Sequence, residues 1–177
     1  PAVIKVARQY FSFFESDSVT SHVKDGRIFI KRALLKKQQY DWIILDAFNG
    51  DYIPEHLLTK EFLSETKALL SANGIVTANT FSVSKLYEYE SATYHSVFEQ
   101  FYNVQNSKNT NRIILAGKQA LPDKESLKGN LAALHERLNP YGVNIVDVYN
   151  SFKTEQDWPA NTPVLTDQFS PANLLNH

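Results

Sequence analysis

The sequence predicts an α/β fold with a mostly parallel sheet that an antiparallel hairpin closes. Helical and strand patterns alternate along the 177 residues. The apolar runs within residues 40–46 and 74–79 lack the alternation of strands with one solvated face. Such runs are typical of parallel strands that helices cover on both faces. Near the middle of the chain, two strands joined by the polar turn 106–111 are expected to pair antiparallel.

Five helices are predicted from apolar residues that recur every three or four positions. Pro1 suits the first turn of the first helix, and the third is expected to end at the cap Ala72-Asn73-Gly74. The predicted helices cover residues 1–11, 27–37, 54–72, 84–100 and 122–138.

Strands are predicted from β-branched and apolar runs that end at turn residues. The first is short, β-branched and alternating, and it leads into Asp25-Gly26. The last two are expected to be antiparallel to each other and the others parallel. The predicted strands cover residues 19–24, 41–46, 74–79, 101–106 and 111–117.

Composition excludes several function classes. The chain has 18 basic and 19 acidic residues, so it carries no positive excess with which to neutralise a nucleic-acid backbone. No apolar run approaches the ~20 residues of a membrane-spanning helix, and no signal peptide opens the chain. The absence of Cys excludes disulfides and thiol nucleophiles, and it fits a cytoplasmic location. Because the chain begins at Pro1 and contains no Met, we expect it to be part of a longer polypeptide.

Polar residues end the predicted strands, where ligands of open α/β sheets bind. Asp46 follows four buried apolar residues and is the sharpest functional signal, although an Asp that caps the following loop is the alternative. Asp51 lies in the same loop, where one carboxylate could accept a proton while the other holds a cationic substrate. The alternative for Asp51 is a turn residue after Asn49-Gly50.

Three other features are weaker. Asp25-Gly26 suits a ligand that needs an acceptor and a close backbone approach, but an N-capping Asp-Gly turn explains it equally well. Asp167 could approach the site from the tail, but a turn residue is the favoured interpretation. The five histidines show no metal-ligand spacing, so no metal site is predicted. The sequence also contains no glycine-rich phosphate loop.

In order along the chain, four segments resemble the spermidine synthase (polyamine aminopropyltransferase) family. They are residues 1–7, 23–27, 40–46 and 54–62, within a similarity that covers roughly residues 1–120. The branch that looks most similar is the bacterial spermidine synthase-like one, whose loop reads Asp-Ala-Phe-x-Gly-Asp. The resemblance implies a Rossmann-like class I S-adenosylmethionine-dependent methyltransferase fold. Residues 1–177 would be the carboxyl-terminal portion of this single catalytic domain, with the family's glycine-rich loop and ribose-binding acid preceding Pro1.

The resemblance also assigns roles to individual residues. Authentic spermidine synthases have Asp-Ser-Ser-Asp-Pro where this chain has a wider spacing of the two acids, so the diamine-binding role of the second acid is less closely matched. The implied residues are Asp46 as the base that deprotonates the attacking amine, Asp25 and Gly26 at the adenine, Pro54 and Leu57 lining the adenine pocket, and Asp51 at the polyamine.

The implied function is polyamine biosynthesis by transfer of an aminopropyl group from decarboxylated S-adenosylmethionine to a polyamine. An alkylammonium has a pKa of about 10.4, so at neutral pH it must lose a proton to a base before its nitrogen can attack. The leaving group is a neutral thioether, so neither a metal nor a prosthetic group is required. The family resemblance suggests a homodimer in the cytoplasm. Two alternatives stay open: an S-adenosylmethionine-dependent methyltransferase of the same fold, and a non-catalytic interaction module.

Overall fold

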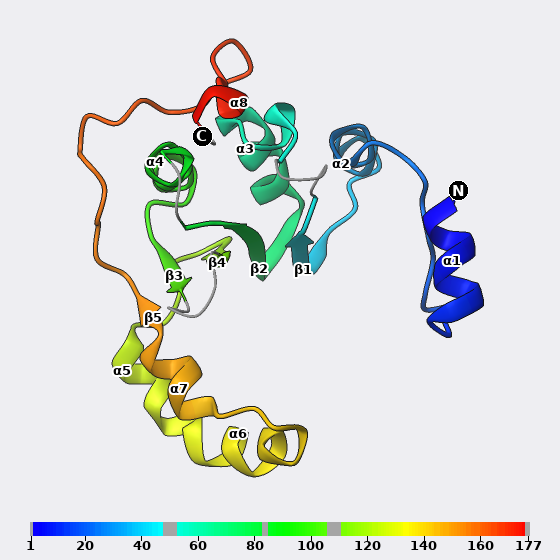
Figure 1. Cartoon of the computed structure of the whole chain (residues 1–177), viewed down its shortest axis with the longest axis vertical. Helices are drawn as coiled ribbons and strands as arrows, with labels where there is room; N and C mark the ends of the chain where they lie inside the picture. The colour runs from blue at the N-terminus through cyan, green and yellow to red at the C-terminus, as the bar shows by residue number, and fades with distance from the viewer. Residues whose placement is uncertain (1, 48–52, 83–84, 106–110, 176–177) are drawn as a thin grey trace.

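The computed structural model describes residues 2–47, 53–82, 85–105 and 111–175 (Figure 1). Within these ranges one sheet has the strand order β1-β2-β4-β3-β5. The strands are β1 (Tyr40–Leu45), β2 (Leu70–Phe81), β3 (Phe101–Gln105), β4 (Asn111–Gly117) and β5 (Phe152–Lys153). The helices and 3₁₀ turns are α1 (Ala2–Tyr10), α2 (Gly26–Leu35), η1 (Glu55–Leu57), α3 (Lys60–Leu69), α4 (Leu86–Phe98), α5 (Lys124–Leu127), η2 (Lys128–Asn130), α6 (Leu131–Leu138), η3 (Asn139–Tyr141), α7 (Ile145–Asn150) and α8 (Ala172–Leu175).

The sheet confirms four of the five predicted strands and the hairpin. β1 pairs parallel with β2, whereas β4 lies antiparallel between β2 and β3. The three strands β1, β2 and β3 therefore run in the same direction, and the sheet as a whole is mixed. The short β5, which pairs antiparallel with β3, has no counterpart among the predicted strands.

The prediction of a strand over residues 19–24 is wrong. This segment forms only an isolated bridge between Ser16 and Val19, and the side chains of Val19 and Val23 are exposed. A β-branched run becomes a strand when a neighbouring strand satisfies its backbone, and within the described residues none lies beside this one.

Two helix boundaries also differ from the prediction. The third helix ends at Leu69 and β2 begins at Leu70, so Gly74 lies inside a strand and is not a helix cap. A Cβ atom at Gly74 would stand 2.8 Å from the carbonyl oxygen of Tyr40, so glycine is needed here for close contact between β1 and β2. The helix predicted over residues 122–138 is divided into α5, η2 and α6, and Gly129 lies in the interruption, where glycine weakens a helix.

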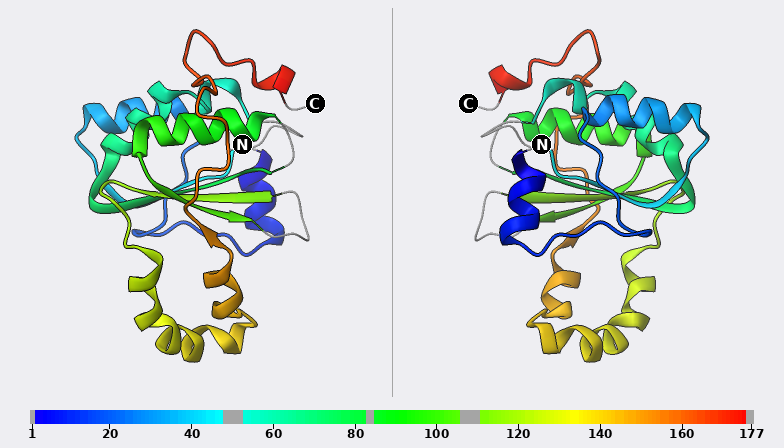
Figure 2. Two further views of the ribbon diagram at one scale, coloured as in Figure 1. Left: turned by 90° about the vertical axis from the view of Figure 1, so that its left-hand side faces the viewer. Right: turned by 90° about the vertical axis from the view of Figure 1, so that its right-hand side faces the viewer.

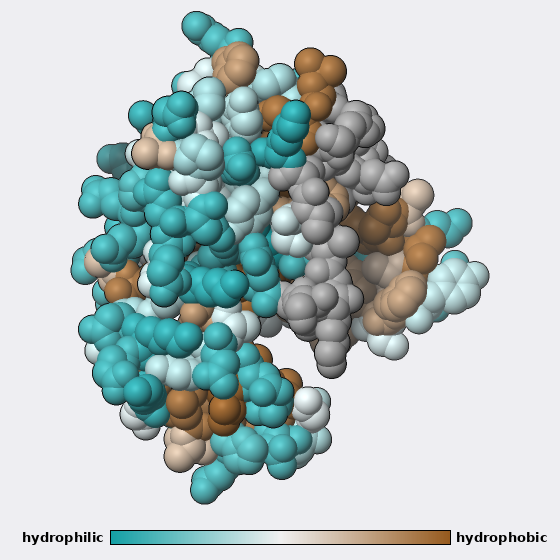
Figure 3. Space-filling view, turned by 60° about the vertical axis from the view of Figure 1, so that its left-hand side comes forward, coloured by the Kyte–Doolittle hydropathy of each residue, from teal (hydrophilic) through white to brown (hydrophobic). Residues whose placement is uncertain are grey.

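Helices α2, α3 and α4 lie together over one face of the sheet, here called the helix-covered face (Figure 2). The core lies between these helices and the sheet, where Leu63, Leu69, Val76 and Ile114 are almost completely buried. Residues 124–150 form an arm that projects from the opposite side of the sheet (Figures 1 and 2). Helix α1 is separated from the sheet and lies beyond the β1 side (Figure 1). Hydrophobic residues are exposed on the arm (Figure 3). The exposed side chains of this segment include Tyr141 and Val146.

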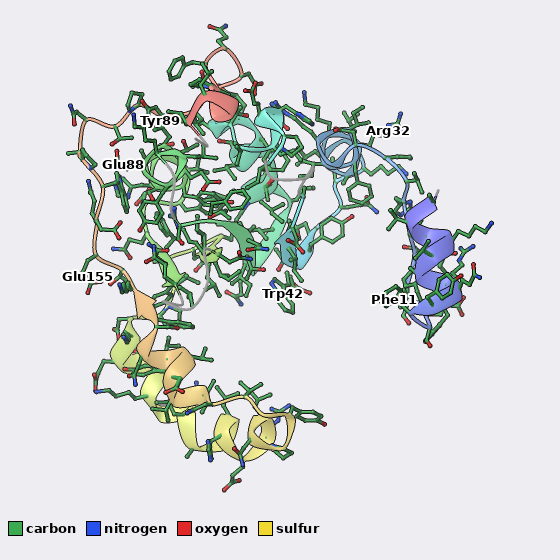
Figure 4. The ribbon with its side chains drawn as sticks, in the orientation of Figure 1. Phe11, Arg32, Trp42, Glu88, Tyr89 and Glu155 are labelled. Carbon is green, nitrogen blue, oxygen red and sulfur yellow. The ribbon has the colours of Figure 1, made fainter. Side chains whose placement is uncertain are left out.

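β1 is less covered than its sequence predicts. Its only strand partner in the described parts of the chain is β2, so β1 forms an edge of the sheet. Trp42 and Ile44 are each 60% exposed, and Trp42 points away from α2, α3 and α4 (Figure 4). The Trp42 indole donates a hydrogen bond to Thr77 on the neighbouring strand. The prediction that β1 is buried on both faces is therefore wrong for the described residues.

A buried polar cluster holds α4 to the sheet. The fully buried Arg112 of β4 donates hydrogen bonds to Asn103 Oδ1 (3.0 Å), the Tyr87 carbonyl (3.1 Å) and Ser91 Oγ (2.8 Å). The guanidinium carbon lies 4.0 Å from the centre of the Tyr87 ring. Glu90, which is equally buried, faces this cluster without a hydrogen bond that satisfies either carboxylate oxygen. Burial raises the pKa of Glu90 to about 7, although the positive charge of Arg112 and the Thr80 hydroxyl oppose the rise.

Glu90 should make the folded chain less stable as the pH rises. The pKa of Glu90 is 4.5 in the unfolded chain and about 7 in the folded chain. Between these pH values the folded chain therefore keeps a proton on Glu90 that the unfolded chain has lost. The free energy of unfolding should therefore fall between about pH 4.5 and 7, by on the order of 1–3 kcal/mol. Glu90→Gln should remove this decline, which denaturant unfolding at pH 5, 6, 7 and 8 would measure. Glu136→Gln, at an exposed position of α6, is the control and should keep the wild-type profile. Parallel profiles for wild type and Glu90→Gln would contradict the assignment.

Candidate active site

A cavity of about 440 Å³ lies at the carboxyl end of β1 and runs along its edge. Its size is typical of small-molecule sites, and its walls are mostly apolar. Asp46, Asn79 and Thr80 contribute polar groups. The lining residues come from α2, β1, η1, α3, β2 and α4: Gly26, Phe29, Ile30, Tyr40, Trp42, Ile43, Ile44, Leu45, Asp46, Ala47, Ile53, Leu57, Leu58, Phe62, Leu69, Ala78, Asn79, Thr80 and Tyr94.

The parallel pairing of β1 and β2 places Asp46 beside Asn79. Leu45 of β1 pairs with Ala78 of β2. The residues that follow this pair are Asp46, directly after β1, and Asn79, within β2. Asn79 Nδ2 donates a hydrogen bond to Asp46 Oδ1 at 3.0 Å, and Asn111 Nδ2 donates to Asn79 Oδ1 at 3.2 Å. The second bond uses the Asn79 oxygen as an acceptor, so it orients the Asn79 amide with its N–H groups toward Asp46.

The alternative of a capping role for Asp46 is not tested directly. The hydrogen bond described for Asp46 goes to the side chain of Asn79. The loop residues 48–52, whose backbone a capping aspartate would bind, lie outside the described residues. Asp51 belongs to the same loop, so its predicted role at the polyamine stays a prediction.

Asp25 caps α2, as one of the two sequence interpretations predicted. Its Oδ1 accepts a hydrogen bond from the Ile28 N–H at 3.0 Å, and its Oδ2 lies 2.8 Å from His56 Nε2. The bond from Ile28 and the contact with His56 hold the pKa of Asp25 below its usual value. Asp25 is thus linked to η1, the short helix that contributes Leu57 to the cavity.

Gly26 and Leu57 are neighbours in the wall of the cavity. A Cβ atom at Gly26 would lie 3.8 Å from Leu57 Cδ2, which is ordinary van der Waals contact. Pro54 precedes η1 and is not among the residues that line the cavity, so its predicted role at the adenine stays a prediction. The structure therefore brings Asp46, Gly26 and Leu57 into one cavity, and Asp25 directly precedes the lining residue Gly26.

Sequence reasoning missed an ion-pair cluster next to this wall. Arg27 is buried and forms a bidentate pair with Asp167, with distances of 2.6 and 2.7 Å, and it also contacts Glu65 at 3.2 Å. Asp167 does lie in a turn, between Thr166 and Phe169, as predicted. Its partner lies 140 residues earlier, and no local pattern in the sequence indicates a contact over that separation.

Within the described residues, no group of three or more His, Cys, Asp or Glu side chains is arranged to hold a metal ion. No helix in the described ranges is both long and apolar enough to cross a membrane.

Comparisons with known proteins bear on the fold and on the family resemblance. No protein-family model matches the chain. Human methyltransferase-like protein 13, solved in complex with SAH, has a TM-score of 0.65 at 20% identity, covering 91% of this chain and 71% of that one. A probable spermidine synthase from Corynebacterium glutamicum has a TM-score of 0.62 at 20% identity, covering 92% and 63%. The chain therefore has the Rossmann-like class I methyltransferase fold that the family resemblance implied.

Within this class, sequence identity points to one family. A polyamine aminopropyltransferase from Vibrio vulnificus is 51% identical over 176 residues, which cover 99% of this chain and 59% of that relative. The resemblance of this chain to the polyamine aminopropyltransferases, the spermidine synthase family, which its motifs indicate, is therefore confirmed. The chain spans less than two thirds of that relative's length.

The capping role of Asp25 leads to a stability prediction. Asp25→Ala should lower the free energy of unfolding by about 1 kcal/mol, because the Ile28 N–H loses its acceptor. Asp25→Asn should cost less, because asparagine is also a good N-cap. Denaturant unfolding would measure both variants, with the exposed Asp17→Ala as a control that should change little. Equal losses for Asp25→Ala and Asp25→Asn would show that charge, and not capping, carries the effect.

Proposed function

We propose that this chain is the carboxyl-terminal portion of the catalytic domain of a spermidine synthase-like aminopropyltransferase. The enzyme transfers an aminopropyl group from decarboxylated S-adenosylmethionine to a polyamine. One observation carries the proposal: Asp46 lies at the carboxyl end of β1, oriented by Asn79, in an apolar cavity whose wall includes Gly26 and Leu57. The identity with the Vibrio vulnificus polyamine aminopropyltransferase supports it.

Asp46 would act on the attacking amine. At neutral pH a polyamine nitrogen is protonated, and a carboxylate both attracts this cation and accepts its proton. The freed nitrogen lone pair then attacks the aminopropyl carbon next to the sulfonium. The new N–C bond forms as the C–S bond breaks, and the electron pair of that bond neutralises sulfur to give methylthioadenosine. The hydrogen bond from Asn79 would keep one Asp46 oxygen fixed while the other meets the amine.

The rest of the cavity would bind the nucleoside. Apolar walls suit the faces of an adenine ring, and a carboxylate such as Asp25 can accept a hydrogen bond from its exocyclic amino group. In this proposal Pro54 and Leu57 line the adenine pocket and Asp51 holds the polyamine. A cytoplasmic location and a homodimer stay predictions.

The role of Asp46 is tested by Asp46→Asn in the polypeptide as its source organism makes it. This change keeps the shape and removes the base, so the rate of methylthioadenosine release should fall by about 10²–10⁴-fold. Asp41→Asn is the matched control, because Asp41 lies on the same strand, binds Ser71 and does not line the cavity. Full activity of Asp46→Asn together with a lower melting temperature would instead support the capping alternative.

A methyltransferase of the same fold is the second candidate, and the SAH-bound fold neighbour favours including it. Calorimetric titration with S-adenosylmethionine and its decarboxylated form should distinguish the two. An aminopropyltransferase should prefer the decarboxylated form, because a site built for it lacks a partner for the carboxylate. Preference for S-adenosylmethionine would favour the methyltransferase, and binding of neither would favour a non-catalytic module.

A further inference from the structure

Arg27 lies behind the cavity wall rather than in it. It follows Gly26 directly in α2, and its guanidinium is not among the groups that line the cavity. Besides the bidentate pair with Asp167, Arg27 Nη1 donates to the carbonyl oxygen of His56 at 3.4 Å. His56 directly precedes the wall residue Leu57. The buried Arg27 therefore lies in the helix that supplies Gly26 and contacts η1, which supplies Leu57.

The tail that provides Asp167 is firmly attached to the start of α3. We call residues 165–170 the C-terminal strap. The Thr59 hydroxyl donates to Asp167 Oδ1 at 2.7 Å, and the Asp167 N–H donates to Glu61 Oε2 at 3.0 Å. Leu165 is completely buried, and its carbonyl accepts a hydrogen bond from the Lys60 N–H at 2.8 Å. Further along, the Ser170 hydroxyl donates to the Glu55 carbonyl of η1 at 3.3 Å.

The charges around Arg27 hold it in one orientation. Asp167 and Glu65 approach the guanidinium from the strap and from α3, and Lys31 of the same helix lies 3.8 Å from Glu65. A guanidinium that binds one carboxylate through two parallel hydrogen bonds is fixed in angle as well as in distance. The hydrogen bonds with Asp167 raise the pKa of Arg27 above its ordinary value and lower that of Asp167, so both groups stay charged across the neutral range.

We propose that Arg27 and Asp167 are positioning residues for the nucleoside wall, through which the C-terminal strap controls affinity for the adenosyl part of the cosubstrate. This inference rests on the proposed function, because it deepens the role of the same cavity. Asn79 donates a hydrogen bond to Asp46 and is itself oriented by Asn111, and neither of these bonds, among those of the described residues, involves the Arg27 cluster. Loss of the ion pair should therefore weaken nucleoside binding and leave the chemical step nearly unchanged.

The test uses Arg27→Lys, Asp167→Asn and the charge-swapped double variant Arg27→Asp/Asp167→Arg in the polypeptide as its source organism makes it. Each single variant should raise the dissociation constant of methylthioadenosine about tenfold, and KM for the nucleoside cosubstrate in parallel, with kcat within about twofold of wild type. The double variant should recover part of the loss. Arg32→Gln is the matched control, because it removes an exposed cation from the same helix, and no side-chain contact with η1, Glu65 or the strap is described for it.

Each outcome is decisive. Wild-type affinity for methylthioadenosine in both single variants would overturn the inference and leave the proposed function standing. A fall in kcat and in folded fraction without a change in affinity would show a merely structural pair, and it would also overturn the inference. S-adenosylhomocysteine is titrated in parallel. If wild type binds neither this thioether nor methylthioadenosine, the proposed function fails, and the inference fails with it.

Discussion

The parallel register between β1 and β2 is the constraint on which the candidate site depends. It places the acid that follows β1 beside the amide in β2, at a hydrogen-bond distance of 3.0 Å. The register contains an irregularity between Tyr40 and Trp42, where β2 advances from Leu70 to Ile75. At this point only a glycine at position 74 fits under the Tyr40 carbonyl. A glycine near the start of β2 therefore fixes the position of an aspartate at the far end of β1, because the register set at one end of a strand pair is carried to the other.

Local sequence patterns predict the elements well and their surroundings less well. The runs that form β1, β2, β3 and β4 have strong strand preferences, and the hairpin is evident from its polar turn. The same reasoning fails for residues 19–24, whose β-branched residues have the right preference but no neighbouring strand in the described chain. It also fails for β1, which was predicted to be buried on both faces but exposes Trp42 and Ile44. In both cases the missing information is which elements lie alongside, and periodicity does not contain it.

The candidate site divides in a similar way. Asp46 could be predicted because a carboxylate that follows a parallel strand emerges at the ligand-binding edge of the sheet. Gly26 and Leu57 were implied by the family resemblance, and the structure brings both to the cavity that contains Asp46. The pairs Arg27–Asp167 and His56–Asp25 could not be predicted, because each joins residues that only the folded chain brings together. Charged residues in a helix and in a turn are ordinary when considered alone.

Two buried arginines do different work on the helix-covered face. Arg112 binds neutral acceptors from α4 and β3, so it fixes a helix on the sheet, and the buried Glu90 carboxyl makes no hydrogen bond with it. Arg27 binds carboxylates from α3 and the strap, so it joins segments that move independently in the unfolded chain. Arginine suits both places, because its planar head satisfies several acceptors at fixed angles. In the proposed site, Asn79 of the sheet orients Asp46, whereas Arg27 lies in the helix of Gly26 and contacts the residue before Leu57. The proposed base and the proposed nucleoside wall therefore rely on separate interactions.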